Sequence, residues 1–263
     1  MRIYLELARL AFQQQFAYRA ATLAGLFTNA IFGVMLASVY LGLYSSRSAG
    51  ASVEGFTATD TVTYVWIGQA MIMPVYIWGW WDIIATIRTG AVVNDMIKPT
   101  NYFAYWLSRD AGRALAHIIL RFVPTIVIGS LIFDLHYPGS PWQAMSFFLS
   151  LLLAVLISFC VRFIFNIWGF WVLDHRGIAG FSAVFIGALS GHLLPIAWYP
   201  DAVRDVINVL PFRAMIMTPI EIWLGQIDVL TGLGSQVFWS IVMIAISQWF
   251  LSIAERKVVV QGG

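Results

Sequence analysis

The chain has 263 residues, of which 60% are hydrophobic, 16% aromatic and only 11% charged. Its mean hydropathy is +0.80, and its apolar share exceeds the roughly 45–50% of soluble domains, which excludes an ordinary soluble protein and indicates an integral membrane protein. The formal net charge of +2 is too small to indicate nucleic-acid binding. Cys160 is the only cysteine, so a disulfide within the chain is impossible, and its apolar surroundings are typical of a small hydrophobe.

Residues 1–19 combine a polar and an apolar stripe at helical spacing. The polar stripe consists of Arg2, Glu6, Arg9 and Gln13, and the apolar one of Ile3, Leu5, Leu7, Leu10, Phe12 and Phe16. This pattern predicts a helix lying in the cytoplasmic membrane interface, with a basic leader as the alternative. The apolar run that begins near Ala20 is about 25 residues long, beyond the about 7–15 of a signal-peptide core, so we expect it to stay as a membrane anchor.

Apolar runs of about 20 residues are long enough to cross the hydrocarbon core as helices. By this rule the sequence predicts an all-α membrane protein with six spans. The predicted spans cover residues 20–44, 61–81, 114–133, 144–173, 178–194 and 236–253.

The positive charges indicate how these spans are oriented. Six spans place both termini on one side, and the segments of that side carry most of the cations: Arg2, Arg9, Arg19, Arg88, Lys98, Arg109, Arg113, Arg176, Arg256 and Lys257. The opposite segments carry only Arg47, Arg204 and Arg213. The positive-inside rule therefore predicts a multi-pass protein of the inner or plasma membrane with both termini in the cytoplasm. A tryptophan belt is expected at the cytoplasmic end of the second span, formed by Trp78, Trp80 and Trp81.

Residues 191–234 are apolar but interrupted by four prolines: Pro195, Pro200, Pro211 and Pro219. A lipid-exposed irregular backbone would leave costly unsatisfied polar groups. We therefore expect short broken helices, partly re-entrant from the outer side and covered by protein.

No catalytic motif is evident. The two lysines, Lys98 and Lys257, belong to no phosphate-binding loop, and the histidines at 117, 136, 175 and 192 form no metal-binding pair. The fragment "GALSGH" places Ser190 and His192 together and suggests an intramembrane hydrolase, but residues two apart point to different faces of a helix. Ser190 followed by glycine is more typical of a helix end, so we expect no enzyme activity, metal or cofactor on this chain.

Polar residues inside the predicted spans are candidates for a translocation pathway, because the bilayer makes them costly. They are Asn29, Gln69, His117, Arg121 and Arg162. His117 and Arg121 are four apart and should share a helix face, and no Asp or Glu falls inside a predicted span to pair with them. Snorkelling to the interface is favoured over a substrate-facing role for Arg121 and Arg162. Asn29 and Gln69 either line the pathway or, by default, join helices by hydrogen bonds.

The stretch "TIRTGAVVNDMIKPTN" (86–101) lies between two predicted spans. Val92, Val93, Met96 and Ile97 would share one side of a two-turn helix opposite Asn94 and Asp95, with Gly90 before it and Lys98-Pro99 as its stop. Its apolar side needs a membrane surface, neighbouring helices or another protein to rest on. The alternative is a helix that only closes the turn.

These features together resemble the ABC-2 type permeases, the membrane subunits of a class of ABC exporters. The resemblance rests on the interfacial helix, the six spans and two segments, "IRTGAVVNDMIKPTNYFAYWLSRDAGRAL" and "LSGHLLPIAWYPDAVRDVINVLPFRAMIMTPIEIWLG". It implies one domain over 1–263, in which 1–19 is a connecting helix, 82–113 a coupling loop and 191–234 an outer cap.

The resemblance also implies partners and site residues. Two ATP-binding subunits, which hold the ATP and magnesium, and a second permease, identical or homologous, would complete the transporter in the lipid membrane. The residues expected to contact the ATPase are Arg88, Gly90, Val93, Asp95, Met96, Lys98 and Pro99, although Asn94-Asp95 replaces leucines of many members. Few buried charges favour an amphipathic or hydrophobic substrate: a drug, lipid, glycan or peptide. A channel or ion-coupled transporter, which should show intramembrane Asp or Glu, and a scaffolding subunit are the alternatives.

Overall fold

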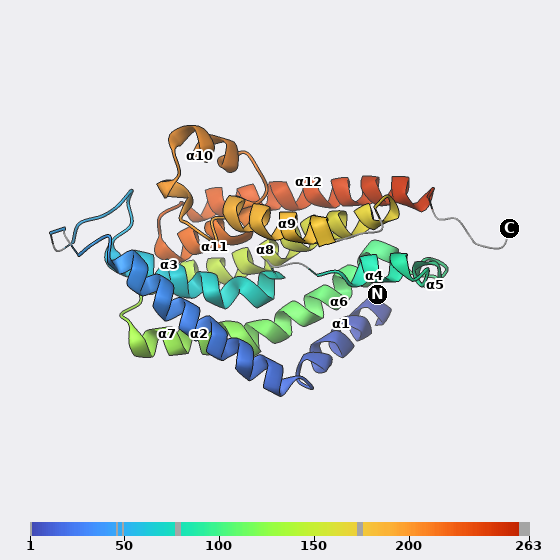
Figure 1. Ribbon diagram of the computed structural model, residues 1–263, viewed down its shortest axis with the longest axis horizontal. Helices are drawn as coiled ribbons and strands as arrows, with labels where there is room; N and C mark the ends of the chain where they lie inside the picture. Colours follow the sequence, from blue (N-terminus) through green and yellow to red (C-terminus); the bar gives the residue numbers. More distant parts are fainter. Residues whose placement is uncertain (1, 46, 49, 77–79, 173–175, 258–263) are drawn as a thin grey trace.

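The computed structural model describes residues 2–45, 47–48, 50–76, 80–172 and 176–257, without the side chains of 176 and 178. All regular elements in these ranges are helical, apart from one isolated bridge between Val53 and Phe56. This confirms the all-α class (Figure 1). In chain order the helices are α1 (Arg2–Gln15), α2 (Arg19–Leu41), α3 (Ala58–Met71), the π-helix η1 (Ile72–Tyr76), α4 (Asp82–Arg88), α5 (Val92–Met96), α6 (Tyr102–His117), the π-helix η2 (Ile118–Phe122), α7 (Val123–Ile132), α8 (Pro141–Ile167), the 3₁₀ turn η3 (Trp168–Phe170), α9 (Arg176–Leu189), the 3₁₀ turn η4 (Ile196–Trp198), α10 (Asp201–Asn208), α11 (Arg213–Leu224) and α12 (Val229–Glu255).

Four helical segments of the described chain are long and apolar enough to cross a membrane. They are α2, the continuous run α6–η2–α7, the run α8–η3, and α12. The bent pair α10–α11, with 101° between its helices, would make a fifth at most. Six spans are therefore not confirmed, because α9 is short and α3–η1 is not among the candidates. Buried polar residues such as Thr61, Thr63 and Gln69 lower the hydropathy of α3, which is surrounded by protein.

The third predicted span begins earlier in the structure than in the sequence interpretation. The side chain of Asn101 accepts a hydrogen bond from the backbone N–H of Ala104 and starts α6 at Tyr102. The residues before Ala114, assigned to a cytoplasmic loop, are thus three turns of a long helix. Asp110 consequently lies inside a membrane-spanning helix, where the sequence interpretation expected no acidic residue.

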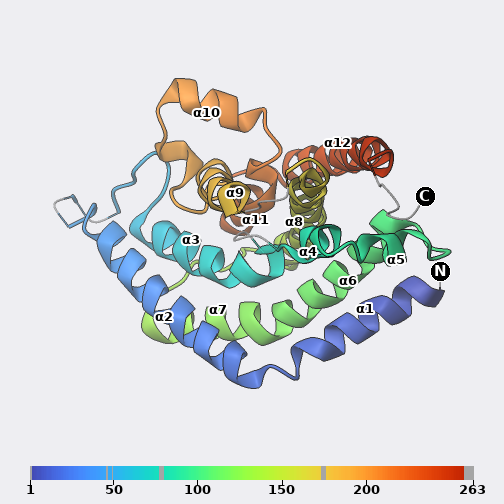
Figure 2. The same cartoon turned by 45° about the vertical axis from the view of Figure 1, so that its right-hand side comes forward.

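The helix predicted within residues 1–19 is confirmed as α1, which lies along α6 (Figure 2). The two helices are closest at Gly112, where an added Cβ would stand 2.0 Å from the carbonyl oxygen of Ala8. Away from α6, α1 exposes its polar stripe and, beside it, the apolar side chains of Ile3, Leu5 and Leu10. Exposed apolar and charged side chains on one helix suit a position in the membrane interface.

One indole ring joins the three helices α2, α3 and α7. Trp66 of α3 is fully buried and lies between Gly33 of α2 and Gly129 of α7. Added Cβ atoms at these glycines would stand 3.1 Å and 2.6 Å from the ring. The two glycines therefore make room for the tryptophan, and the ring fills the space where α2, α3 and α7 meet.

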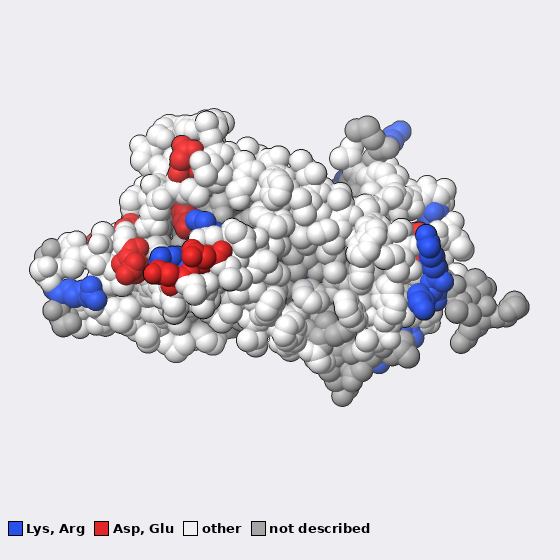
Figure 3. Space-filling view, turned by 90° about the horizontal axis from the view of Figure 1, so that it is seen from above, with Lys and Arg blue, Asp and Glu red and all other residues white. Residues whose placement is uncertain are grey.

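Charged side chains gather at the two ends of the molecule, and Figure 3 shows a broad uncharged zone between them. The start of α1, the end of α12 and α5 lie at one end, and α10 lies at the other (Figure 1). An uncharged belt of this kind is what lipid requires. Which end faces the cytoplasm stays a prediction from the positive-inside rule. Of the expected tryptophan belt, Trp80 packs inward on Trp106 and Phe159, and residue 78 lies outside the described residues.

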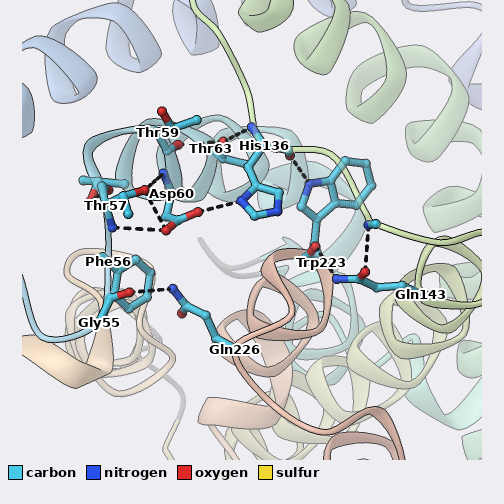
Figure 4. A network of polar contacts seen from close by, with 12 residues as sticks. Gly55, Phe56, Thr57, Thr59, Asp60, Thr63, His136, Gln143, Trp223 and Gln226 are labelled. Atoms are coloured by element: carbon cyan, nitrogen blue, oxygen red, sulfur yellow. Dashed lines mark hydrogen bonds and ion pairs between the residues drawn. The ribbon is translucent and has the colours of Figure 1, made fainter. Parts of the chain in front are cut away.

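A polar network fixes the end of the molecule that carries α10 (Figure 4). Thr57 and Asp60 form a capping box at the start of α3. The Oδ1 atom of Asp60 also lies 2.7 Å from Nδ1 of His136 in the α7–α8 loop, and Nε1 of Trp223 at the end of α11 donates to the carbonyl of His136 at 2.7 Å. The Nε2 atom of Gln143 in α8 donates to the carbonyl of Trp223 at 2.9 Å. This network therefore connects α3, α8 and α11.

Residues 191–234 contain the short broken helices that the prolines predict. They are η4, α10 and α11, with Pro219 inside α11. The left-handed residue Gly225, with φ +69°, ends α11. Whether the segment re-enters the membrane from the outer side stays a prediction.

Candidate translocation cavity and coupling loop

The largest of the described cavities, about 560 Å³ in volume, is bounded by α2, α3, η1, η2 and the residues that follow α9. We call it the apolar cavity, because most of its wall is hydrocarbon: Phe32, Met35, Leu36, Ile72, Met73 and Leu193. Its volume falls within the about 300–1,000 Å³ of small-molecule sites. A few polar side chains interrupt the wall, namely Thr28, Asn29, Gln69, Arg121 and His192.

Two of the predicted pathway residues meet at this cavity by a helix-to-helix hydrogen bond. Nδ2 of Asn29 in α2 donates to the main-chain carbonyl of Gln69 in α3 at 3.0 Å. Both side chains are buried, with exposed fractions of 6% and 5%. A hydrogen bond therefore joins these two helices, as the sequence favoured, and both residues also line the cavity wall.

Arg121, the third predicted residue at this cavity, does not snorkel to the interface. Its guanidinium crosses to α2 and donates from NH1 to the carbonyl of Thr22 at 2.7 Å. The residue is only 6% exposed, and an added Cβ at Gly25 would overlap its guanidinium at 1.9 Å. The snorkelling prediction is wrong here, because Gly25 leaves space for the guanidinium against the backbone of α2. A fixed positive charge thus stands in a mostly apolar wall.

His117 lines a different cavity from Arg121. The π-helix η2 follows His117 directly, and its wider turn changes the direction in which later side chains point. His117 faces a smaller cavity of about 200 Å³ between α1 and α6, which we call the polar cavity. The expectation that His117 and Arg121 share a face assumed regular α-helical spacing, and it is wrong because that spacing is interrupted.

Arg162 belongs to a buried ionic cluster. NH1 and NH2 of Arg162 in α8 donate to the two carboxylate oxygens of Asp110 in α6 at 3.1 and 2.8 Å, and Nε of Arg113 donates to Oδ1 at 2.9 Å. The guanidinium carbons of Arg113 and Arg162 lie 4.5 and 5.6 Å from the ring centroid of Tyr76. Snorkelling is therefore wrong for Arg162 as well, because a carboxylate holds it inside the bundle.

The ionic cluster joins α6, α8 and the π-helix η1. In addition to its hydrogen bond to Asp110, Arg113 donates to the carbonyls of Met73 and Pro74 in η1, at 2.6 and 3.1 Å. Sequence reasoning missed Asp110 because it was assigned to a loop. The signal that could have found it is the i, i+3 spacing of Asp110 and Arg113, which places opposite charges on one helical face.

The predicted coupling loop contains two short helices rather than one. Gly90, with φ +74°, separates α4 from α5 and adopts a conformation that favours glycine. Val92 is buried, as the apolar face predicted, and Val93 and Met96 are half-buried. Ile97 lies beyond the end of α5 and is 74% exposed, so its place on the buried face is wrong.

Two charged residues of this loop, Asp95 and Lys98, pair with each other. Nζ of Lys98 lies 2.6 Å from Oδ1 of Asp95 and 4.9 Å from the ring centroid of Tyr105. The hydrogen bond that Lys98 donates to Asp95 raises the pKa of Lys98, so Lys98 stays charged at neutral pH. Arg88 at the end of α4 and Pro99 after Lys98 are exposed. Contact of these residues with an ATPase stays a prediction.

Asn166, a residue that sequence reasoning missed, anchors the loop to α8. Its Oδ1 accepts a hydrogen bond from the backbone N–H of Ile84 in α4 at 3.1 Å, and its Nδ2 donates to the carbonyl of Trp80 at 2.6 Å. An amide in the apolar run "FIFNIW" was the available signal. Through Asn166, the short helix α4 is connected directly to a membrane-spanning helix.

The hydrolase alternative finds no support in the described geometry. Ser190 is fully buried, and its hydroxyl donates to the carbonyl of Gly187 at 3.4 Å. Gly191 follows with φ +76°, so Ser190-Gly191 ends α9, as expected from the sequence. Within the described ranges, no group of three or more His, Cys, Asp or Glu residues could hold a metal ion.

Comparison with known proteins supplies the family. A family model described as ABC-2 family transporter protein matches residues 33–262. No curated protein matches the sequence. The matched region includes the ionic cluster, both short helices of the loop and the part of the apolar cavity wall from Met35 onward, whereas Gly25, Thr28, Asn29 and Phe32 precede it. The chain therefore belongs to the ABC-2 family of transporter proteins and is a multi-pass membrane protein.

Proposed function

We propose that the chain is the permease subunit of an ATP-driven exporter that moves an amphipathic or hydrophobic substrate out of the cytoplasm. The observation that carries this proposal is the apolar cavity, which combines a hydrocarbon wall with a few fixed polar groups. Hydrocarbon walls suit the apolar part of a substrate, and Asn29, Gln69 and Arg121 suit its polar part.

The motor would be a separate ATP-binding subunit, two copies of which bind ATP and magnesium, and a second identical or homologous permease would complete the pathway. The exposed surface of the loop, formed by Arg88, Gly90, Ile97, Lys98 and Pro99, is the proposed docking site. Because residues from Tyr102 onward form α6, the coupling loop that we propose is residues 82–101 rather than 82–113.

The proposed coupling follows the contacts of the loop. When the ATPase pair closes, it moves α4 and α5, and Asn166 transmits this movement to α8. The ionic cluster between Asp110 and Arg162 connects α8 to α6. Movement of these helices would open the apolar cavity alternately to the two sides, with α10 and α11 covering the outer end.

A cavity-filling substitution tests the transport role. In proteoliposomes with the ATPase, we expect Gly25→Leu to lower transport at least tenfold, because the new side chain overlaps Arg121 and enters the cavity. Co-purification of the ATPase should not change. The matched control is Gly180→Leu, since an added Cβ at Gly180 has nothing within 4 Å. Transport by Gly25→Leu at the rate of the unchanged protein would refute the assignment of this cavity.

The docking site has its own test. Ile97→Glu places a charge on the most exposed apolar residue of the loop, and Arg88→Glu reverses a charge at the end of α4 in the same loop. We expect both variants to lose the co-purifying ATPase. Arg256→Glu, at the exposed end of α12, is the control for a charge reversal at the same end of the molecule. Retention of the ATPase by both loop variants would contradict docking at this loop.

Asp110 raises an ion-coupled transporter as a second candidate, because such proteins use intramembrane carboxylates. In the structure, however, both of its oxygens accept hydrogen bonds from arginines, which leaves the carboxylate little capacity for a proton or a cation. Transport driven by a proton or sodium gradient without ATP would favour this second function.

A further inference from the structure

The polar cavity lies between α1 and α6, apart from the apolar cavity to which the proposed function refers. Its volume is about 200 Å³, below the about 300–1,000 Å³ of sites that hold whole drug-sized molecules. Most of its wall is polar: Gln14, Gln15, Tyr76, Asp82, Arg109, Asp110, Arg113 and His117. This size and chemistry fit a small charged group rather than an entire amphiphile.

Two of the charged groups in this wall have no partner of opposite charge in the described part of the chain. Arg109 is half-buried, and its guanidinium stacks on the ring of Trp106 with 4.7 Å between the guanidinium carbon and the ring centroid. Asp82 begins α4 and is exposed. The charge of Arg113, by contrast, is already offset by Asp110. The polar cavity therefore presents one available cation and one available anion.

A third group at the cavity is a buried polar atom without a partner. His117 is only 6% exposed, and its Nδ1 has no hydrogen-bond partner among the described residues. Buried polar atoms of this kind are nearly always paired with protein, water or a ligand. In the tautomer with its proton on Nδ1, the imidazole would donate to an anionic oxygen in the cavity.

We propose that the polar cavity binds the headgroup of a zwitterionic phospholipid that carries a primary ammonium group. Arg109 and His117 bind the phosphate, because a guanidinium donates to two phosphate oxygens at once. Asp82 accepts hydrogen bonds from the ammonium. Both charges of the headgroup thus meet their complements within one site.

The position of α1 supports a lipid as the source of this headgroup. The helix covers the cavity with Ala11, Gln14 and Gln15, and it exposes both apolar side chains, Leu5 and Leu10, and the polar stripe that contains Arg9. A helix that exposes both apolar and charged side chains suits the boundary of headgroups and acyl chains. The polar cavity is therefore at the depth where phospholipid headgroups are found.

The aromatic rings of the cavity favour a primary ammonium over a trimethylammonium group. Quaternary ammonium groups are bound by free aromatic faces. The ring of Tyr76 already faces the guanidinium carbon of Arg113 at 4.5 Å, and the ring of Trp80 faces that of Arg162 at 5.8 Å. A carboxylate such as Asp82 instead accepts N–H donors, which a trimethylammonium group lacks.

Native mass spectrometry of the full-length protein in detergent tests the proposal without any transport assay. The protein is titrated with phosphatidylethanolamine, phosphatidylcholine and phosphatidylglycerol of identical acyl chains, and with inorganic phosphate as the free-anion arm. We expect phosphatidylethanolamine to bind at least fivefold more tightly than either other lipid, and inorganic phosphate not to compete at equal concentration. Preference for phosphatidylglycerol, or equal binding of all lipids, would overturn the proposal, as would effective competition by inorganic phosphate.

Two substitutions test the cation and the anion of the site one at a time. Arg109→Gln should weaken all three phospholipids at least fivefold. Asp82→Asn should weaken phosphatidylethanolamine to a similar extent and leave phosphatidylglycerol unchanged or more tightly bound. Both residues lie at the rim, so folding should persist, and circular dichroism of each variant checks it. Arg256→Gln and Glu255→Gln are controls outside the polar cavity. Unchanged phosphatidylethanolamine binding in either rim variant refutes the site, whatever the outcome of the transport experiments.

Discussion

The carboxylate of Asp110 offsets two arginines in the interior between α6 and α8. The exposed fractions of the side chains of Arg162 and Asp110 are 2% and 1%. Removing ions from water is costly, and a buried cluster is maintained only when its hydrogen bonds are complete. Here the carboxylate accepts from both arginines, and Arg113 has two further carbonyl partners.

We expect Asp110→Asn to lower the free energy of unfolding by about 3–5 kcal/mol, because two buried guanidinium groups lose their counterion. Denaturant unfolding of the purified protein in mixed micelles measures this. The control is Asp95→Asn, which breaks an ion pair whose Lys98 side chain is 43% exposed and should cost no more than about 1 kcal/mol. Equal effects of the two substitutions would show that the cluster contributes nothing special to stability.

The hydrogen bond donated by Trp223 can also be tested by measuring the stability of a variant that lacks it. Trp223→Phe retains a large aromatic ring but removes the Nε1 donor to the carbonyl of His136. The expected loss of stability is about 1 kcal/mol plus the loss of ring contacts. Trp142→Phe, at a position that is 58% exposed, is the matched control and should change little. A larger effect at residue 142 than at residue 223 would contradict the role of the network.

At the level of helices, local patterns predicted much of the fold. The polar and apolar stripes of residues 1–19 predicted α1, and the prolines of 191–234 predicted the short helices there. The start of α6 was not predicted, because Arg109, Asp110 and Arg113 interrupt its apolar sequence. Asp110 and Arg113 have partners in α8 and in η1, and such long-range partners are not visible in a local window.

The close contact of α1 with α6 has a direct test. Gly112→Leu should separate the two helices, because even a Cβ there would stand 2.0 Å from the backbone of Ala8. We expect trypsin to cleave after Arg9 at least several times faster in this variant. In the control, Gly234→Leu, the new Cβ has nothing within 4 Å and cleavage should not change. Equal protection of Arg9 in both variants would mean that α1 does not depend on this contact.

For the whole molecule, the arrangement of the candidate site was less predictable than its residues. Asn29, Gln69 and Arg121 were chosen as polar residues in apolar runs, and the structure brings them to one cavity. His117 and Arg162 were chosen by the same criterion and lie elsewhere. The difference depends on the π-helix η2 and on Asp110, which direct these side chains away from the apolar cavity. Neither feature follows from counting polar residues.

The orientation of the molecule can be tested because its only cysteine is buried. Cys160 is fully buried, so the unchanged protein should react little with an impermeant maleimide. In right-side-out vesicles, we expect Val209→Cys, after α10, to be labelled directly and Lys98→Cys only after permeabilisation. Both residues are exposed. Val209 directly follows α10 and Lys98 lies just after α5, and these two helices are at opposite ends of the molecule (Figure 1). The reverse labelling pattern would place the loop with α4 and α5 outside the cell.

The packing of the Trp66 ring between Gly33 and Gly129 restricts which side chains these three positions can accept during evolution. A side chain at residue 129 would need the space that the indole occupies, and a small residue at 66 would leave a void among three helices. Neither change is tolerable alone, so the three positions should vary together among related sequences. A relative with a larger residue at the position of Gly129 should carry a smaller one at the position of Trp66, and sequences that combine two bulky residues there should be absent.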